Sequence, residues 1–126
     1  MCGIAGLINR DPLDSFALSP ALELMINQII HRGPDSHNVW LHPSKQLGLG
    51  HTRLAILDLT VNGIQPMQSE SRNFTISYNG EIYNHLQLRK DLGLSSKIWK
   101  GTSDTETLLA CIEAWGLDDT LCKVHG

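Results

Sequence analysis

The sequence predicts an α+β domain in which helices are layered against sheet. Segments with the patterns of strands and helices alternate along the chain in the order strand, helix, several strands, helix, strand, helix. Of the 126 residues, 41% are hydrophobic and 18% are charged, which is typical of a globular protein and not of a disordered chain or a coiled coil. A chain of this length usually forms one domain, so residues 1–126 are expected to share one fold.

The first elements are expected to be a strand, a loop and a helix. Residues 2–9 form a short apolar run that predicts a buried strand, and residues 11–19 predict a surface loop. Ser19 suits the N-cap of a helix, and Pro20 suits the first helical position. Apolar residues then recur at helical spacing until Gly33-Pro34, which is expected to end the helix.

The middle of the chain predicts strands. Residues 39–41 and 47–56 have strand patterns, and residues 73–78 alternate well enough for another strand. Gly48 and Gly50 lie in the second of these segments, where the missing side chains would let a neighbouring element approach the backbone closely.

The C-terminal part predicts helices with one short strand between them. A helix is expected over residues 83–92, a strand over 97–100 and a further helical segment over 117–124. The SDTE segment at 103–106 has the spacing of a capping box, which predicts that an amphipathic helix begins there and continues until Gly116.

Charge and cysteine content exclude several classes of protein. The net charge is −3 and the isoelectric point is near 6.0, so the chain has no general attraction for nucleic acid or an anionic membrane. No apolar run approaches the roughly 18 residues of a membrane span, and the N-terminus does not have the pattern of a secretory signal. Three cysteines without a Cys-x-x-Cys pair, and histidines without metal-ligand spacing, predict no disulfide framework and no metal site. A cytoplasmic location fits this cysteine usage.

Cys2 stands where a side chain and an amino terminus can act together. If Met1 is removed, the thiol and a free α-amine belong to one residue, and such an amine titrates near ~7.7–8.0. The amine can then accept the thiol proton near neutral pH, which is the N-terminal-nucleophile route to covalent catalysis. A chain that keeps Met1 is expected to have little or no activity of this kind. The alternative is that Cys2 is a small buried residue at the start of a strand.

Six short motifs occur in the order found in class II glutamine amidotransferase domains. They are MCGIAG (1–6), HRGPD (31–35), GHTRLAI (50–56), QPM (65–67), YNGEIYN (78–84) and SDTE (103–106). Each motif alone is weak, whereas six in order across nearly the whole chain are highly specific. The chain therefore resembles this family, and Pro34 together with the YNGEIYN segment makes it similar to the asparagine synthetase type. The resemblance implies an N-terminal-nucleophile hydrolase fold, which is an αββα sandwich.

The resemblance implies that the domain hydrolyses L-glutamine to glutamate and ammonia. Cys2 would attack the side-chain amide and form a thioester, which water then hydrolyses. The oxyanion donors of the family match the side-chain amide of Asn79 and the backbone N–H of Gly80. An Asn-Gly turn is also common in β proteins that have no such role.

The resemblance also assigns residues to the amino-acid end of glutamine. Arg53 matches the residue that binds the α-carboxylate, and Asp104 and Glu81 match positions near the α-ammonium. From the residue types alone, Arg53 could equally be an exposed strand residue, and Asp104 could serve the helix dipole as an acid in the first turn. Three further polar residues are interpreted as structural: His31, Arg32 and His51.

The resemblance implies that the chain is part of a larger enzyme. In this family the glutaminase domain normally continues beyond the position of Gly126, so the domain is expected to be incomplete here. The chain has no phosphate-binding loop of the Ser-Gly-Gly-x-Asp-Ser or Gly-x-x-x-x-Gly-Lys type, so it is expected to need no cofactor. ATP and Mg²⁺ are expected only in the synthetase domain, a ligase that would use the ammonia for asparagine biosynthesis. The alternatives are an amidotransferase with a different ammonia acceptor and a non-catalytic interaction module that keeps the fold. The sequence leaves open whether the chain forms a homodimer.

Overall fold

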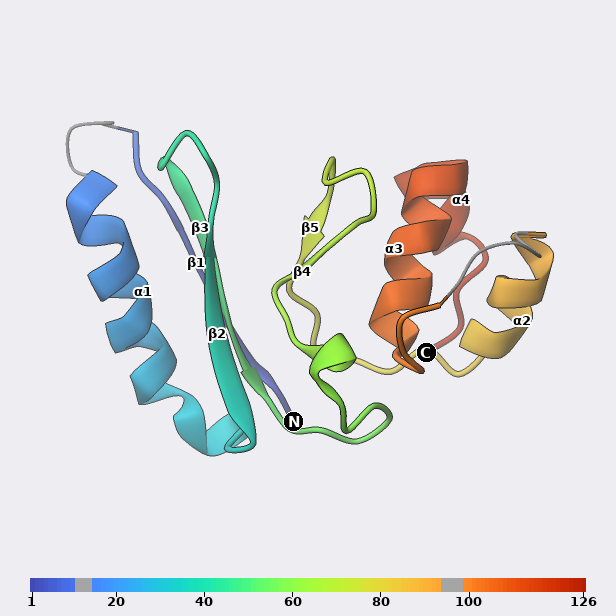
Figure 1. The fold of residues 1–126 in the computed structure, drawn as a ribbon, viewed down its shortest axis with the longest axis horizontal. Coiled ribbons are helices and arrows are strands. Elements are labelled where there is room, and N and C mark those ends of the chain that lie inside the picture. Colours follow the sequence, from blue (N-terminus) through green and yellow to red (C-terminus); the bar gives the residue numbers. More distant parts are fainter. Residues whose placement is uncertain (11–14, 94–98) are drawn as a thin grey trace. The chain divides into compact units, whose positions relative to one another are not determined.

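The computed structural model describes residues 1–10, 15–93 and 99–126. These residues form helices and short antiparallel sheets, which confirms the predicted mixture of α and β structure (Figure 1). The chain divides into two compact units. Unit 1 comprises Met1–Ala55, Ile64–Pro66 and Ser77–Asn79. Unit 2 comprises Ile56–Gly63, Met67–Ile76 and Gly80–Gly126.

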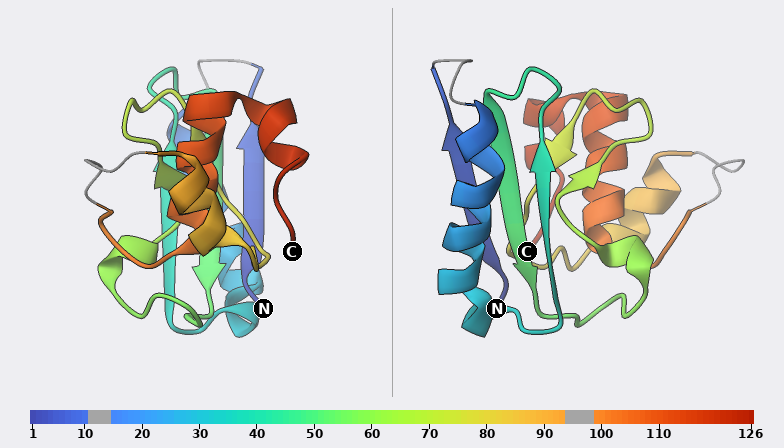
Figure 2. Two further views of the ribbon diagram at one scale, coloured as in Figure 1. Left: turned by 90° about the vertical axis from the view of Figure 1, so that its right-hand side faces the viewer. Right: turned by 60° about the vertical axis from the view of Figure 1, so that its left-hand side comes forward.

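The described part of unit 1 is an antiparallel sheet with one α-helix on it. Its elements are β1 (Gly3–Ile8), α1 (Ser15–Gln28), the 3-10 turn η2 (Ile30–Arg32), β2 (Ser36–Leu41) and β3 (Leu47–Arg53). The strands lie in the order β1-β3-β2, so the longest strand, β3, is in the centre. Figure 2 shows α1 running along one face of this sheet. The predicted strands over 2–9, 39–41 and 47–56 are therefore confirmed, with ends shifted by a few residues.

The helix packs directly over the glycines of the central strand. A Cβ atom added at Gly48 would lie 2.3 Å from Cδ1 of Leu22, and one added at Gly50 would lie 2.7 Å from Cδ1 of Ile26. Both of these α1 side chains are fully buried. The expectation that Gly48 and Gly50 allow a close approach is confirmed, because any larger residue at either position would occupy the space that the helix fills.

The start of α1 differs from the prediction. The helix begins at Ser15, so Ser19 is not its N-cap and Pro20 lies inside it. The expected surface loop over 11–19 is therefore wrong from Ser15 onward, and residues 11–14 lie outside the described residues. Leu18 is buried in the same row as Leu22, one turn earlier, and this packing outweighs the one backbone hydrogen bond that a proline near a helix start removes. The helix also ends earlier than expected, because the segment before Gly33 forms the separate turn η2.

The described residues of unit 2 form a two-stranded sheet and three helices. Its elements are the turn η3 (Val61–Gly63), β4 (Met67–Gln68), β5 (Thr75–Ile76), α2 (His85–Asp91), α3 (Asp104–Trp115) and α4 (Leu117–Leu121). The predicted strand over 73–78 shortens to β5, and the helices predicted over 83–92 and 117–124 shorten to α2 and α4. The predicted strand over 97–100 lies partly outside the described residues, and its described part, Trp99 and Lys100, belongs to no strand.

The longest helix of unit 2, α3, begins and ends where its local signals predict. The hydroxyl oxygen of Ser103 accepts a hydrogen bond from the Thr105 N–H at 3.2 Å, so Ser103 is the N-cap. Gly116 ends the helix with a positive φ of 84°, which glycine adopts without strain. The capping box itself is wrong in one respect: the Glu106 carboxylate accepts from the N–H groups of Lys100 and Gly101.

Candidate active site

Cys2 lies beside the C-terminal end of the central strand of unit 1. The backbone N–H of Leu54 points at Cys2 Sγ from 3.4 Å, which is the geometry of a donor to a thiol or thiolate. The N–H of Gly3 donates to Thr52 Oγ1 at 3.0 Å, which fixes the backbone just after the sulfur. Cys2 is half-buried, whereas Met1 is 74% exposed and therefore accessible for removal. A removed Met1 would leave an amine and a sulfur on the same residue.

The HRGPD segment contacts both Cys2 and Arg53. The Arg32 Nε–H donates to the Cys2 carbonyl at 3.1 Å, and the Asp35 N–H donates to the Arg53 carbonyl at 3.1 Å. A Cβ added at Gly33 would lie 2.4 Å from the Thr52 carbonyl carbon, so only glycine allows this close approach. Arg32, which we interpreted from the sequence as structural, therefore contacts the predicted nucleophile Cys2, and Asp35 of the same segment contacts the predicted carboxylate-binding residue Arg53.

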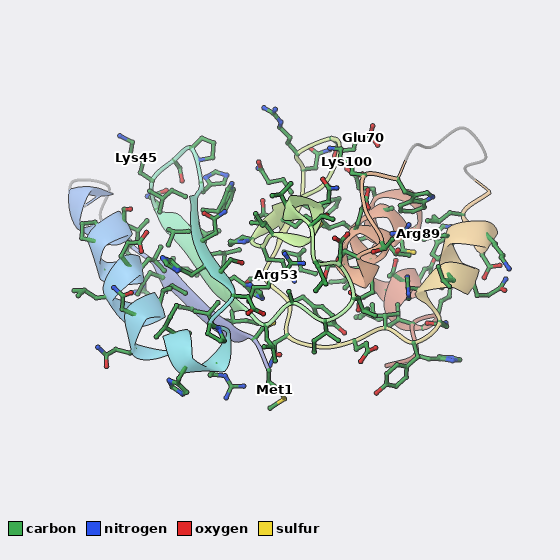
Figure 3. The ribbon with its side chains drawn as sticks, turned by 60° about the horizontal axis from the view of Figure 1, so that its bottom comes forward. Met1, Lys45, Arg53, Glu70, Arg89 and Lys100 are labelled. Carbon is green, nitrogen blue, oxygen red and sulfur yellow. The ribbon has the colours of Figure 1, made fainter. Side chains whose placement is uncertain are left out.

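Arg53 is the last residue of β3, and its side chain is half-buried. The pairing of Gly3 with Thr52 places the start of β1 and the end of β3 at the same end of the sheet, and Figure 3 labels Met1 and Arg53 there. Unit 1 thus brings together two of the six predicted site residues, Cys2 and Arg53.

Three side-chain contacts fix the segment that leads to Asn79. The Tyr78 N–H donates to Gln65 Oε1 at 2.6 Å, and the Tyr78 carbonyl lies 3.2 Å from His51 Nε2. Ser77 Oγ donates to the Gly50 carbonyl at 3.3 Å. Both backbone groups of Tyr78 are therefore bonded, and Asn79 follows from a fixed point in unit 1.

His51 is completely buried and acts as a neutral donor. Burial lowers the pKa of its imidazole, the hydrogen bond to Tyr78 raises it, and the nearby positive charge of Arg53 lowers it further. A backbone carbonyl can only accept, so Nε2 of the neutral ring carries the hydrogen and Nδ1 does not. Nδ1 has no hydrogen-bond partner among the described residues. The interpretation of His51 as a structural residue is therefore supported by a specific contact with Tyr78, the residue before Asn79.

The other three predicted residues, Gly80, Glu81 and Asp104, belong to unit 2. Gly80 follows Asn79 directly, so the two predicted oxyanion donors are adjacent residues, and the backbone bends at Gly80. Glu81 is exposed, whereas Asp104 is 6% exposed at the first position of α3. Asp104 Oδ2 accepts from the Ile82 N–H at 2.8 Å, and Oδ1 accepts from the Thr105 N–H at 2.9 Å. Asp104 therefore connects the start of α3 to the segment that carries Glu81, and its carboxylate keeps lone pairs for a further donor.

The last residues of the chain lie against the same segment. The Tyr83 N–H donates to the His125 carbonyl at 2.7 Å, and the His125 N–H donates to Asn84 Oδ1 at 3.0 Å. Asn84 Nδ2 also donates to the Lys123 carbonyl at 2.9 Å. Residues 82–84 of unit 2 are therefore bonded on one side by Asp104 and on the other by residues 123–125.

Four contacting residues were missed as part of the site: Arg32, Gln65, Ser77 and Tyr78. All four lie in or directly beside the six motifs, which was the available signal. Within the described ranges, the structure places no three His, Cys, Asp or Glu side chains where they could hold a metal ion. Nor is any helix of those ranges long and apolar enough to cross a membrane.

Comparison with known proteins identifies the family. Residues 1–126 match the glutamine amidotransferase domain family. The chain is 42% identical over 111 residues to asparagine synthetase [glutamine-hydrolyzing] 1 of Bacillus subtilis, covering 87% of this chain and 17% of the relative. It is 40% identical over 127 residues to a probable asparagine synthetase [glutamine-hydrolyzing] of Dictyostelium discoideum, covering 100% of this chain and 22% of the relative. It is also 34% identical over 125 residues to the amidase chry2 of Gibberella zeae, covering 93% of this chain and 18% of the relative.

The chain spans about a fifth of the length of these relatives. The family match, in contrast, extends from the first residue to the last. The structure places Cys2 beside the end of β3 and fixes the backbone of Tyr78, directly before Asn79 and Gly80. Because the family model matches the whole of residues 1–126, this chain belongs to the glutamine amidotransferase domain family.

Proposed function

We propose that this chain is the glutaminase part of an asparagine synthetase, which hydrolyses glutamine and supplies ammonia to an ATP-dependent synthetase domain. The observation that supports this most is the position of Cys2, whose sulfur lies 3.4 Å from the Leu54 N–H at the accessible end of β1. The similarity to glutamine-hydrolysing asparagine synthetases over most of the chain favours the same reaction.

In the first step, the free α-amine of Cys2 takes the thiol proton, and the thiolate attacks the side-chain amide carbon of glutamine. The carbonyl π electrons move to oxygen and form a tetrahedral oxyanion. When the oxyanion collapses, the C–N bond breaks, the nitrogen takes the proton from the α-amine, and ammonia leaves. Water then adds to the thioester carbon, and glutamate leaves as the sulfur regains a proton.

The oxyanion needs donors that are fixed before the reaction. We assign this role to the Asn79 side-chain amide and the Gly80 backbone N–H, which belong to adjacent residues. The bonds from Tyr78 to Gln65 and His51 support this assignment, because they fix the backbone directly before Asn79. Loss of one such donor typically lowers kcat by about 10²–10³-fold.

The amino-acid end of glutamine needs one cation and one anion. We assign the α-carboxylate to Arg53, whose planar guanidinium can donate two parallel hydrogen bonds. We assign the α-ammonium to Asp104 and Glu81. An amide without these α groups would lose the contacts with Arg53, Asp104 and Glu81, which favours glutamine over simple amides.

The wider proposal concerns the fold and the rest of the enzyme. We propose an N-terminal-nucleophile αββα arrangement for the glutaminase domain, in a cytoplasmic protein. ATP and Mg²⁺ would serve the synthetase domain, and the chemistry of Cys2 would need no cofactor. A homodimer is compatible with the proposal and is not required by it.

The central experiment measures ammonia release from glutamine by the full-length protein with Met1 removed. Cys2→Ala is expected to lower kcat by at least about 10³-fold, because it removes the nucleophile. Cys122→Ala is the matched control, since Cys122 is an exposed cysteine in the same protein, and it should retain parental activity. A Cys2→Ala protein that hydrolyses glutamine at the parental rate would overturn the assignment.

A second measurement tests the amine. An electrophilic glutamine analogue should modify Cys2 and spare the exposed Cys122, because only Cys2 would lie beside the bound amino acid. Protein whose Cys2 nitrogen is blocked by retained Met1 should lose both labelling and hydrolysis. Intact mass separates the two forms, and full activity of the blocked form would contradict the role of the amine.

One relative favours a second candidate, a related enzyme with a different ammonia acceptor. The chain is 34% identical to an amidase over 93% of its length. The candidates differ only in the acceptor, so product analysis of the full-length protein with glutamine, ATP, Mg²⁺ and aspartate distinguishes them. Formation of asparagine supports the synthetase, whereas glutamine hydrolysis without asparagine favours the second candidate.

A further inference from the structure

The side chain of Arg89 occupies a partly buried position between α2 and the start of α3 in unit 2. Figure 3 labels it there, and its side chain is 13% exposed. Its Nε–H donates to Thr107 Oγ1 at 2.7 Å. Its two terminal nitrogens donate to the carbonyls of Gly101 at 3.0 Å and Ser103 at 2.9 Å. Arg89 lies outside the six motifs of the family, and none of the roles proposed above uses it.

Further contacts complete the bonding of the same short segment. The N–H groups of Lys100 and Gly101 donate to the two oxygens of Glu106, at 2.9 and 3.0 Å. The Thr102 N–H donates to Asp58 Oδ2 at 2.8 Å. Asn62 Nδ2 donates to the Lys100 carbonyl at 2.7 Å. Together with the two carbonyls bonded by Arg89, these contacts fix the backbone over residues 100–103, which leads directly into Asp104.

Only a guanidinium can make the Arg89 contacts together. Its planar fork directs three donors at three different oxygens, whereas a lysine ammonium would be a single point. The guanidinium carbon also lies 4.0 Å from the centre of the Trp99 ring, a stacking contact that lysine makes less well. Burial lowers the pKa of Arg89, while Glu106 and Asp58 raise it, and a guanidinium in such surroundings stays charged at neutral pH.

We propose that Arg89 is a positioning residue for substrate selection, because it fixes the backbone before Asp104 and so directs the Asp104 carboxylate toward the α-ammonium of glutamine. This inference rests on the proposed function and extends it to a residue that never touches the substrate. The geometry that supports it is the pair of carbonyl contacts on either side of Thr102, together with the bond from Ile82 to Asp104. With the backbone fixed on one side and Ile82 on the other, the carboxylate has little freedom to turn.

The experiment compares two substrates of the full-length enzyme, glutamine and glutaramate, which is glutamine without its α-ammonium group. Arg89→Met should lower kcat/KM for glutamine by about 10- to 100-fold, chiefly through KM, because a displaced carboxylate no longer pairs with the ammonium. The value for glutaramate should change by less than about threefold, since that substrate offers Asp104 nothing to bind. Arg89→Lys should show the same pattern as Arg89→Met, because the fork is lost.

The matched control is Lys90→Met, which removes a neighbouring exposed cation from the same helix. It should leave both substrates at parental values. If Arg89→Met proves too unstable to assay, Thr107→Val keeps the guanidinium but removes the acceptor of Nε and the 3.4 Å bond from Thr107 Oγ1 to the Ser103 carbonyl. It should lower the preference for glutamine by a few-fold in the same direction.

Three results separate failure of this inference from failure of the proposed function. Equal losses for glutamine and glutaramate with unchanged KM would show that Arg89 only maintains the amount of active protein, and would overturn the inference. An Asp104→Asn enzyme with parental preference for glutamine would also overturn it, while the hydrolysis itself would stand. A parental protein that releases no ammonia from glutamine would instead refute the proposed function.

Discussion

At the level of single residues, His51 illustrates what a buried polar group requires. The ring is neutral, donates through Nε2 to the Tyr78 carbonyl, and lies on the strand that ends in Arg53. Charging this ring would place a cation in a buried site beside another cation, so the folded protein resists its protonation. His51 therefore makes the stability of the protein depend on pH.

The direction of this dependence follows from the lowered pKa. Below about pH 6.5 the unfolded chain binds a proton at His51 that the folded protein does not bind. The contribution of the neutral His51 ring to the free energy of unfolding should therefore be complete above about pH 6.5. As the pH drops toward the pKa of the folded state, the free energy of unfolding should fall by at most about 1.4 kcal/mol per pH unit from this group. His51→Gln, which has no titrating ring, should flatten this slope in urea unfolding measured at several pH values.

The control for this prediction is His37→Gln, because His37 is exposed on the neighbouring strand β2. That variant should keep the parental slope. An unchanged slope in His51→Gln would contradict the assignment of the buried neutral ring.

Gly33 is the residue whose substitution should be costly for backbone reasons. An added Cβ would lie 2.4 to 2.5 Å from backbone atoms of Thr52 and Arg53, which cannot move like a flexible side chain. We expect Gly33→Ala to lower the free energy of unfolding by about 1–3 kcal/mol. It should also raise KM for glutamine, because Arg53 would shift.

Gly6→Ala provides the comparison for Gly33→Ala. Its nearest contact would be 3.5 Å from Leu49 Cδ2, which is ordinary van der Waals distance. Urea unfolding should show a change within about 0.5 kcal/mol for this exposed position. Equal losses at the two glycines would argue against the close approach at Gly33.

At the level of secondary-structure elements, α1 and β3 form a contact that depends on small residues. Gly48→Ala should collide with Leu22 and Leu41 and lower the free energy of unfolding by about 1–3 kcal/mol. Leu22→Ala alone should lower it by about 2–5 kcal/mol, because it leaves a cavity. In the double variant the new methyl group occupies part of that cavity, so the combined loss should be smaller than the sum. Chemical denaturation of the four proteins of this cycle measures the coupling, and strict additivity would contradict the contact.

How well each element could be predicted depended on whether its signals were local. Helix α3 was predicted at both ends, because Ser103 bonds within its own first turn and Gly116 adopts its own positive φ. The start of α1 was not predicted correctly, because the preference of Pro20 for the first helical position is outweighed by the packing of Leu18 in a core built from distant strands. The partners of Glu106 were also not predicted by the local pattern, because its carboxylate bonds Lys100 and Gly101, which precede the N-cap Ser103.

At the level of the whole molecule, unit 1 is assembled from three separate stretches of chain. The sequence predicted six site residues from motif order. It could not predict that Arg32 contacts Cys2, or that Gln65 and His51 both contact Tyr78, because these contacts join positions far apart in the chain. Such pairings depend on the folded backbone, which residue spacing does not specify.

This interleaving leads to a prediction about fragments. Residues 1–55 contain the whole sheet of unit 1 but not Tyr78, the hydrogen-bond partner of His51, whereas residues 1–79 contain all three stretches. Hydrogen exchange should therefore show stronger protection of β3 amides in the 1–79 fragment than in the 1–55 fragment. Equal protection in both fragments would show that the two short stretches contribute nothing to the stability of the sheet.

The turn between β2 and β3 has a practical consequence for labelling the protein. Lys45 is exposed there with a φ of 56°, and β3 runs from this turn to Arg53, about 20 Å away. An affinity peptide at the amino terminus would acylate the very nitrogen that the proposed chemistry requires. The hairpin tip offers an insertion point for a fluorophore or purification sequence that leaves this nitrogen chemically intact.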